Sequence, residues 1–288
     1  MKILSRHLHN VVLFTVLITV SVSSIAQNIP EHAQGLNEEL VSVDLSDKKK
    51  QVGVYSIKKG SSNPTKLAVL LPGYPSVVRP VVENGVMTGS KLNGNFLIRS
   101  RRFLVDESVA SLIVDCQSES GDYCAGNYQA SKQRQEDVDQ LISEVKKRIP
   151  SITEVWLVGT SMGTISSSFM PIHNATAYAG AIHTASITEP YARGSYRELG
   201  GFDYKKSKIP QFFIHHSGDP CALTTYSGAK SIAEKYGAVL VTVSGGTGFQ
   251  GPACAAFTEH GFRGKEKEVM NAITAIIKTG KASQLDIN

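Results

Sequence analysis

The sequence has little cysteine, and its cysteines and histidines show no metal-binding pattern. It contains four cysteines and eight histidines among 288 residues, and neither a Cys-x-x-Cys nor a His-x-x-x-His spacing occurs. Zinc sites are usually recognised in sequences by such closely spaced pairs. The sequence therefore predicts no metal site.

A strong charge of either sign, internal repeats and low-complexity tracts are also missing. The formal net charge is +5, and no stretch interleaves basic with aromatic side chains in the way that indicates nucleic-acid binding. Nucleic acid is therefore not expected as a partner. The length and a hydrophobic content of 41% suit one large domain or two small ones with a sizeable core.

The apolar run Val11 to Val20 is too short to span a bilayer comfortably. Lys2 and Arg6 precede it, and the small residues Ser24 and Ala26 follow it. This arrangement is typical of a cleavable signal peptide, residues 1–26, cut after Ala26; a membrane anchor is the alternative. Cleavage would remove two positive charges and lower the net charge to about +3. We therefore expect an exported protein, periplasmic or secreted, without a stable membrane anchor.

All four cysteines follow the expected cleavage site. An even number of cysteines in an oxidising compartment favours disulfides. Of the three possible pairings, the local Cys116–Cys124 and the longer Cys221–Cys254 are the simplest. Four buried free thiols are the alternative.

Strand and helix patterns alternate along the rest of the chain. A polar leader, residues 27–38, is expected to be flexible. Leu40 to Leu45 and Gln51 to Ile57 alternate apolar and polar residues around a lysine-rich turn, which predicts a hairpin. Short apolar runs predict buried strands at Lys66–Leu71, Ala110–Val114, Val155–Val158, Tyr178–His183, Gln211–His215 and Ala238–Val243. Apolar residues at helical spacing predict helices at Phe96–Leu104, Ser131–Arg148, Thr164–Met170, Tyr226–Tyr236 and Glu266–Lys278.

This alternation predicts the α/β fold class. We expect a three-layer sandwich whose central sheet is mostly parallel, with the antiparallel hairpin at its start. Residues 75–94 lack periodicity and are expected to form a long loop, and residues 187–208 a short irregular insert. Because repeats are missing, residues 39–288 are predicted to form a single domain.

The strand predicted at Val155–Val158 ends in Gly159-Thr160-Ser161-Met162-Gly163. A Gly-x-Ser-x-Gly sequence between a strand and a helix is typical of a nucleophile elbow, which holds a serine at a sharp turn. The turn strains the serine backbone and brings strand and helix together, so a Cβ at Gly159 or Gly163 would collide with its surroundings. These residues resemble the α/β-hydrolase superfamily.

The resemblance implies a catalytic triad in the chain order serine, acid, histidine. Asp219 stands in a turn directly after a predicted strand, where the superfamily places its acid. His260 is the sole histidine beyond Ala238, between the last strand and the last helix. The resemblance therefore implies Ser161, Asp219 and His260 as the catalytic residues. A simple turn aspartate and a surface histidine are the alternatives.

The resemblance also implies an oxyanion hole built from two backbone N–H groups. One belongs to Met162, directly after the nucleophile. The other is expected in the loop after the Lys66–Leu71 strand, where many members have His-Gly and this chain has Pro72-Gly73-Tyr74-Pro75. Since proline replaces a side chain and not the required amide, the Tyr74 N–H is the candidate donor.

Several residues near these motifs need an interpretation. His215 and His216 are rival bases, but they lie at the strand end beside the acid and are interpreted as packing groups or as groups that support the catalytic residues. Arg99, Arg101 and Arg102 fall on the polar side of the Phe96 helix; we interpret them as a solvated helix face rather than as contacts to an anionic substrate.

The short insert implies that the large cap of some relatives is missing. Tyr191, Tyr196, Phe202 and Tyr204 there, together with residues 76–93, are expected to line the substrate pocket. A Cys221–Cys254 bridge would tie the loop of Asp219 to the loop of His260.

The predicted signal peptide and the resemblance together imply an exported serine hydrolase that cleaves an ester of a small molecule through an acyl-enzyme and needs no cofactor. Two alternatives stay open. One is a serine peptidase or amidase of the same fold, acting on a peptide substrate. The other is a binding protein that has kept the fold and lost turnover.

Overall fold

A computed structural model describes residues 29–190 and 196–288. The predicted signal peptide, residues 1–26, lies outside these ranges, as does Tyr191. Within the two ranges, no helix is both long and apolar enough to cross a membrane.

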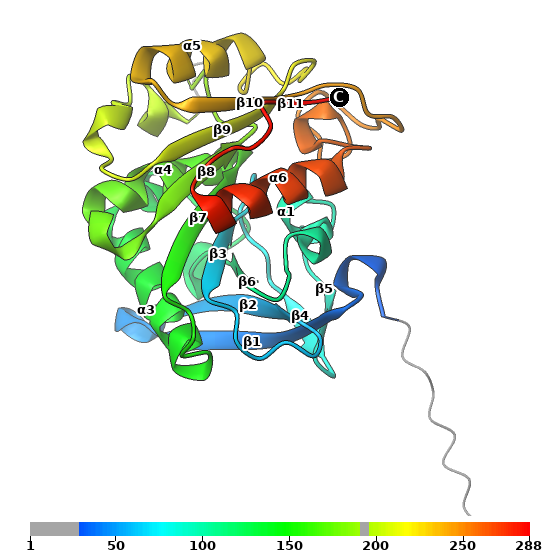
Figure 1. Ribbon diagram of the computed structural model, residues 1–288. Coiled ribbons are helices and arrows are strands. Elements are labelled where there is room, and N and C mark those ends of the chain that lie inside the picture. Colours follow the sequence, from blue (N-terminus) through cyan, green and yellow to red (C-terminus); the bar gives the residue numbers. More distant parts are fainter. Residues whose placement is uncertain (1–28, 191–195) are drawn as a thin grey trace, which may run out of the picture.

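A nine-stranded sheet runs through the middle of the described chain (Figure 1). Its strands are, in spatial order, β1 (Leu36–Asp44), β2 (Lys50–Lys58), β6 (Val109–Val114), β3 (Lys66–Leu71), β7 (Glu154–Thr160), β8 (Gly180–Thr184), β9 (Gln211–His216), β10 (Val239–Val243) and β11 (Asp286–Ile287). The β1–β2 and β2–β6 pairs are antiparallel, and every other neighbouring pair is parallel. The mostly parallel sheet with an antiparallel hairpin at its start is therefore confirmed.

Helices cover both faces of this sheet (Figure 1). Their bounds are α1 (Phe96–Arg99), α2 (Gly126–Gln129), α3 (Lys132–Arg148), α4 (Thr164–His173), α5 (Tyr226–Tyr236) and α6 (Glu266–Thr279). The helices α3 and α4 pack together on one face, while α1 and α6 lie on the other. Ser131 caps α3 by accepting a hydrogen bond from the Arg134 N–H, and Gly280 ends α6 in the left-handed conformation.

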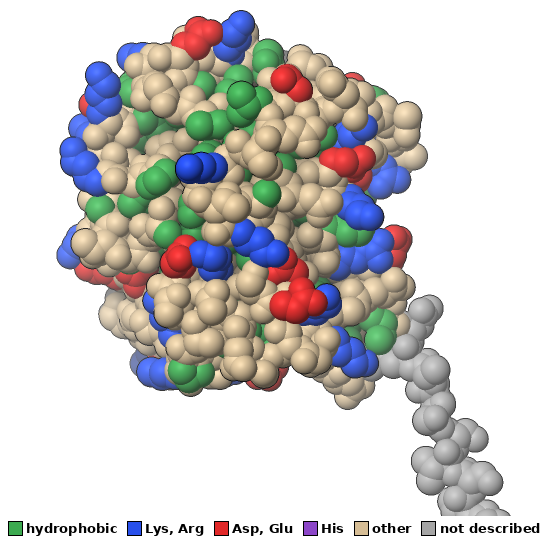
Figure 2. Space-filling view, in the orientation of Figure 1, with side chains coloured by type: hydrophobic (Ala, Val, Ile, Leu, Met, Phe, Trp, Pro, Cys, Tyr) green, Lys and Arg blue, Asp and Glu red, His purple; other side chains and the backbone are tan. Residues whose placement is uncertain are grey.

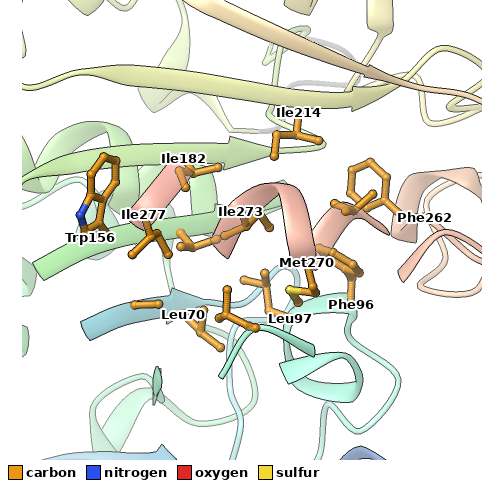
Figure 3. Packing of buried hydrophobic residues seen from close by; sticks show 14 of the residues in the cluster. Leu70, Phe96, Leu97, Trp156, Ile182, Ile214, Phe262, Met270, Ile273 and Ile277 are labelled. Atoms are coloured by element: carbon orange, nitrogen blue, oxygen red, sulfur yellow. The ribbon is translucent and has the colours of Figure 1, made fainter. Parts of the chain in front are cut away.

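Successive side chains of β3 point to opposite faces of the sheet and contribute to two separate hydrophobic cores. Leu67, Val69 and Leu71 pack under α3, whereas Ala68 and Leu70 face α6 on the other side. Figure 3 shows the second core, where side chains of the strands and of α6 interdigitate. Its labelled residues include Leu70, Phe96, Trp156, Ile182, Ile214, Phe262, Met270, Ile273 and Ile277, all at most 4% exposed. Each buried side chain of this size stabilises the fold by roughly 1.5–3 kcal/mol.

The flexible leader expected at residues 27–38 is wrong over its described part. Residues 31–33 form a 3-10 turn and β1 begins at Leu36. The polar sequence of this segment suggests exposure to solvent, but Glu38 is fully buried. It pairs with the equally buried Arg101, with an Nε–Oε1 distance of 2.7 Å. The carboxylate also accepts hydrogen bonds from the Ser56 hydroxyl and the Met87 N–H.

The interpretation of the arginines as a solvated helix face is wrong for Arg101 and Arg99. Arg101 is completely inaccessible, and the side chain of Arg99 is only 10% exposed. The helix expected over 96–104 is in fact α1 followed by a 3-10 turn, Arg101–Phe103. Because the chain tightens after Ser100, Arg101 turns inward to reach Glu38 rather than pointing to solvent.

Residues 75–94 contain a small hairpin that the sequence analysis treats as loop. It consists of β4 (Val81–Glu83) and β5 (Val86–Gly89). Asn84 and Gly85 between them both have positive φ, which is what a two-residue hairpin turn requires. The Asn-Gly pair was the available signal.

On the face shown in Figure 2, basic and acidic side chains lie interspersed. No patch of one sign stands out on that face, which agrees with the small net charge.

Candidate active site

The chain turns sharply at Ser161, between β7 and α4. Ser161 has a φ of +50°, a conformation that is strained for a residue with a side chain. A Cβ at Gly159 would lie 2.4 Å from Ser167 Oγ, and one at Gly163 would lie 2.0 Å from the Leu71 carbonyl oxygen. The predicted collisions at both glycines are therefore present, and the motif has the geometry of a nucleophile elbow.

The loop after β3 lies directly against this serine. A Cβ at Gly73 would be 3.0 Å from Ser161 Cβ, so the backbone that leads into Tyr74 passes beside the candidate nucleophile. The Tyr74 N–H makes no hydrogen bond within the described part of the chain. The Met162 N–H directly follows the serine in the chain, in the 3-10 turn Ser161–Gly163.

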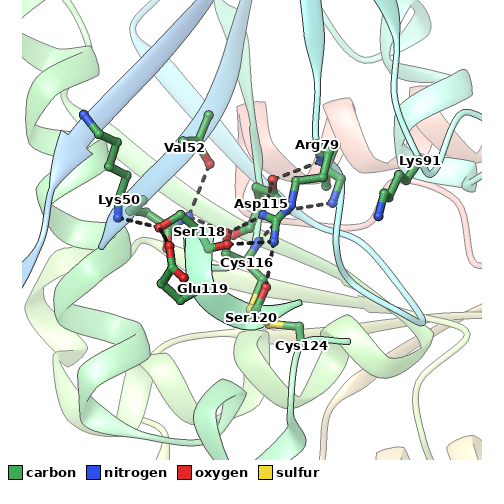
Figure 4. Close-up of polar contacts among 12 residues, drawn as sticks. Lys50, Val52, Arg79, Lys91, Asp115, Cys116, Ser118, Glu119, Ser120 and Cys124 are labelled. Atoms are coloured by element: carbon green, nitrogen blue, oxygen red, sulfur yellow. Dashed lines mark hydrogen bonds and ion pairs between the residues drawn. A yellow bond between two sulfur atoms is a disulfide. The ribbon is translucent and has the colours of Figure 1, made fainter. Parts of the chain in front are cut away.

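A hydrogen-bond network around the buried Asp115 supports the loop after β3 (Figure 4). Asp115, 2% exposed at the end of β6, accepts hydrogen bonds from the N–H groups of Val78 and Arg79 at 2.6 and 2.9 Å. The Arg79 guanidinium returns to the same carboxylate at 3.0 Å. Cys124 is bonded to Cys116, and its N–H donates to the Pro75 carbonyl at 3.0 Å. The first disulfide loop therefore supports the segment that follows Tyr74.

His260 and Asp219 are in contact although they are 41 positions apart in the chain. The distance from His260 Nδ1 to Asp219 Oδ2 is 3.1 Å, and the two side chains are 7% and 1% exposed. The other carboxylate oxygen of Asp219 accepts a hydrogen bond from the Cys221 N–H at 2.9 Å. This is the arrangement in which a carboxylate orients an imidazole.

Thr224 is part of the same network, and sequence reasoning missed it. Its hydroxyl lies 2.7 Å from Asp219 Oδ2 and 3.0 Å from His260 Nδ1. Threonine in a loop carries no sequence signal of its own; the spacing of five residues from the acid became informative only once His260 was in place.

Ser161 and His260 line one cavity of about 370 Å³. Gly73, Tyr74 and Thr160 form its side next to the elbow. The remaining wall is partly apolar and includes Leu92, Asn95, Phe96, Tyr196, Leu223 and Ala256. Of the aromatic residues expected here, Tyr196 lines the cavity, while Tyr204 is buried between His183, Phe213 and Tyr236 and Phe202 packs beside it.

Both cysteines of the second disulfide lie in the cavity wall. Cys221 and Cys254 are bonded, and they join the loop of Asp219 to the loop of His260 as the sequence suggests.

Arg99 also supports the His260 loop. Its guanidinium donates to the carbonyls of Gly94 and Gly261 at 2.6 and 2.7 Å and pairs with Glu266 at 3.1 Å.

The neighbouring histidines make other bonds. His215 is fully buried, and its Nε2 accepts a hydrogen bond from the Ser186 N–H at 2.8 Å. Burial lowers the pKa of His215 to about 3, so this imidazole is neutral. His216 lies 2.8 Å from the Gly245 carbonyl and accepts a hydrogen bond from the Gly218 N–H. Both rings therefore serve as packing and bonding groups around the acid loop.

Over residues 29–190 and 196–288, no group of three or more His, Cys, Asp or Glu side chains is placed to hold a metal ion. In its described part, the segment between β8 and β9 contains two 3-10 turns, Arg197–Leu199 and Tyr204–Lys206, and no helix longer than these turns.

No protein-family model matches the chain, and no curated protein matches it by sequence. Solved structures do match. A serine hydrolase without lid from Xanthomonas campestris is 12% identical, with a TM-score of 0.55 over 82% of this chain and 94% of its own. An esterase from Pyrococcus furiosus is 14% identical, with a TM-score of 0.56 over 84% of this chain and 92% of its own. Est1E from Butyrivibrio proteoclasticus is 13% identical, with a TM-score of 0.54 over 84% and 98%. The chain has the α/β-hydrolase fold, as its elbow motif predicts.

Proposed function

We propose that this chain is an exported serine hydrolase that cleaves an ester through an acyl-enzyme. One observation carries the proposal: a serine on a strained elbow and a histidine bonded to a buried carboxylate line the same cavity. A serine hydroxyl becomes a nucleophile when a base takes its proton, and the base needs a partner that holds its tautomer. The structural neighbours, which include a serine hydrolase and an esterase, support the same reaction class.

Each proposed step uses a named group. His260 takes the proton of Ser161 as the serine oxygen attacks the carbonyl carbon, and Asp219 stabilises the resulting imidazolium. The N–H groups of Met162 and Tyr74 bind the oxyanion. His260 then gives its proton to the leaving alcohol and later activates the water that releases the acid product.

The cavity suits a small group next to the carbonyl. Its volume of about 370 Å³ is near the lower end for ligand sites, and Leu92 and Leu223 contribute apolar wall. A peptidase or amidase of the same fold is the second candidate, because the same groups serve amide cleavage. It differs in predicting turnover of amide as well as ester reporters.

Export is part of the proposal. Two disulfides support it, since such bonds persist mainly in oxidising compartments. The partner we expect is therefore a small-molecule or peptide substrate met outside the cytoplasm.

The first test is covalent labelling of the exported, oxidised protein with a fluorophosphonate. We expect one adduct, mapped to Ser161, on a chain whose intact mass begins at Gln27. Ser161→Ala should abolish labelling, and His260→Ala should slow ester turnover by roughly 10⁴- to 10⁶-fold, because the serine then lacks its base. Folded protein that forms no adduct would contradict the proposal and favour a binding protein.

A further inference from the structure

A completely buried threonine touches both members of the acid–base pair. Thr224 is 0% exposed. Its Oγ1 lies 2.7 Å from Asp219 Oδ2 and 3.0 Å from His260 Nδ1. Since His260 Nδ1 is also 3.1 Å from the same carboxylate oxygen, the three atoms form a closed triangle of hydrogen-bond distances.

The chemistry of the three groups fixes where the protons lie. An ionised carboxylate only accepts hydrogen bonds, whereas a hydroxyl has one proton and two lone pairs. The proton of Thr224 is therefore directed at Asp219, and a lone pair of Oγ1 is left to face His260. That lone pair accepts from Nδ1–H, which is thus shared between two acceptors.

This arrangement selects one tautomer of His260. With the proton on Nδ1, the other ring nitrogen carries the lone pair that can receive the proton of Ser161. The opposite tautomer would point a lone pair of Nδ1 at the carboxylate of Asp219 and leave Thr224 with two groups competing for its single proton. Two acceptors also restrict rotation of the ring more than one does.

The loop that carries Thr224 is itself held in place. The Thr224 N–H donates to the Cys221 carbonyl at 3.1 Å, and the Cys221 N–H donates to Asp219 Oδ1 at 2.9 Å. Cys221 is in turn bonded to Cys254, six residues before His260. The threonine hydroxyl therefore has little freedom to leave the pair.

We propose that Thr224 is a positioning residue of this active site: its hydroxyl bridges Asp219 and His260, holds the carboxylate by donation and holds the imidazole in its Nδ1–H form by acceptance. The proposal rests on the proposed serine hydrolase function, because the bridge has a catalytic consequence only if His260 acts as the base.

The test compares Thr224→Val, which keeps the shape and removes the hydroxyl, with Thr224→Ser, which keeps the hydroxyl. We expect Thr224→Val to lower kcat on an ester by roughly 10- to 100-fold, as loss of a hydrogen bond to a charged group would, with KM changed by less than about twofold. Thr224→Ser should stay within about threefold of the wild-type kcat. In the proton NMR spectrum of the full, oxidised chain, the low-field Nδ1–H resonance of His260 should shift or broaden in Thr224→Val and persist in Thr224→Ser.

Thr225→Val is the matched control. Thr225 is the neighbouring residue, and its hydroxyl caps α5 by accepting from the Gly228 N–H at 3.1 Å. Its loss should lower the melting temperature and leave both kcat and the Nδ1–H resonance unchanged. If Thr224→Val does not fold, Thr224→Ala is read in the same way.

A folded Thr224→Val protein with wild-type kcat and an unchanged Nδ1–H resonance would overturn the proposal. Failure of the hydrolase function is a separate result: wild-type protein would then form no fluorophosphonate adduct and turn over no ester. The resonance would still report whether Thr224 contacts His260 in that case.

Discussion

At Gly163 the elbow helix and the loop after β3 touch through their backbones. A Cβ there would lie 2.0 Å from the Leu71 carbonyl oxygen and 2.6 Å from that of Pro72. The same loop carries Gly73 and Tyr74 past Ser161, so the glycine sets the distance between the nucleophile and a proposed oxyanion donor. The absence of a Cβ at Gly163 therefore allows the Tyr74 loop to approach Ser161.

Gly163→Ala is expected to push the Tyr74 loop away from Ser161, because neither backbone segment can yield without moving β3 or α4. We predict loss of fluorophosphonate labelling and a free energy of unfolding lower by roughly 1–3 kcal/mol, the usual cost of overpacking. Gly89→Ala is the control, since a Cβ there would have its nearest neighbour at 4.0 Å. Equal labelling rates in the two variants would contradict this account of the elbow.

Individual residues also mark the limit of what the sequence predicts. The elbow glycines and Ser161 are recognisable because their spacing follows from a steric requirement. Arg101 and Glu38 are not recognisable as a buried pair, because each looks like a surface residue in the sequence. They are 63 positions apart in the chain, and only the fold brings them into contact. Thr224 belongs to the same class: its contacts depend on where His260 lies.

Among the elements, the buried histidines of β8 and β9 give the fold a dependence on pH. His183 on β8 is fully buried between Ser167 Oγ at 2.8 Å and Gln211 Oε1 at 2.6 Å. Burial lowers the pKa of His183 to about 4, and that of His215 on β9 to about 3, because a charged imidazolium would lose its hydration. Both rings are therefore neutral in the folded protein.

The sign of the pH effect follows from proton binding. In the unfolded chain histidine titrates near 6.5, so between about pH 6.5 and 4 the unfolded state binds more protons than the folded state. The stability is fully present above this window and falls as the pH drops through it, by about 1.4 kcal/mol per pH unit for each histidine. Urea unfolding at about pH 7.5 and about pH 5 should show this loss, and it should be smaller in His183→Gln. Equal losses in wild type and variant would show that His183 is not a source of the effect.

The long elements are those that the sequence predicts best. Periodicity over many residues defines α3, α5 and α6 within one or two positions of their observed bounds. Short elements escape because their patterns are too brief: β11 has two residues and α2 has four, and neither was predicted. The helix predicted at Phe96–Leu104 is present only as the single turn α1 followed by a 3-10 turn. The β4–β5 hairpin was missed despite its Asn-Gly turn, since the surrounding segment looks aperiodic.

For the molecule as a whole, two disulfides support the two halves of the proposed site. Cys116–Cys124 lies behind the Tyr74 loop, and Cys221–Cys254 joins the loops of Asp219 and His260. In the chain-entropy account, their closed loops of 8 and 33 residues of separation stabilise the fold by at most about 2.5 and about 4 kcal/mol. Stability and alignment of the site are therefore expected to depend on an oxidising environment.

Replacing each bridge separately by alanines tests this dependence. Cys221→Ala/Cys254→Ala should lower the free energy of unfolding by up to about 4 kcal/mol and weaken the low-field Nδ1–H resonance of His260, because the base loop is no longer tied to the acid loop. Cys116→Ala/Cys124→Ala should lower the free energy of unfolding by up to about 2.5 kcal/mol. The Nδ1–H resonance of His260 should stay in place, because this disulfide lies beside the proposed oxyanion loop and not beside His260. Urea unfolding and proton NMR on the same samples give both readings. If the first variant keeps the resonance and the wild-type labelling rate, the packing of Arg99 against the Gly261 carbonyl and Glu266 is sufficient to align the base, and the bridge contributes stability alone.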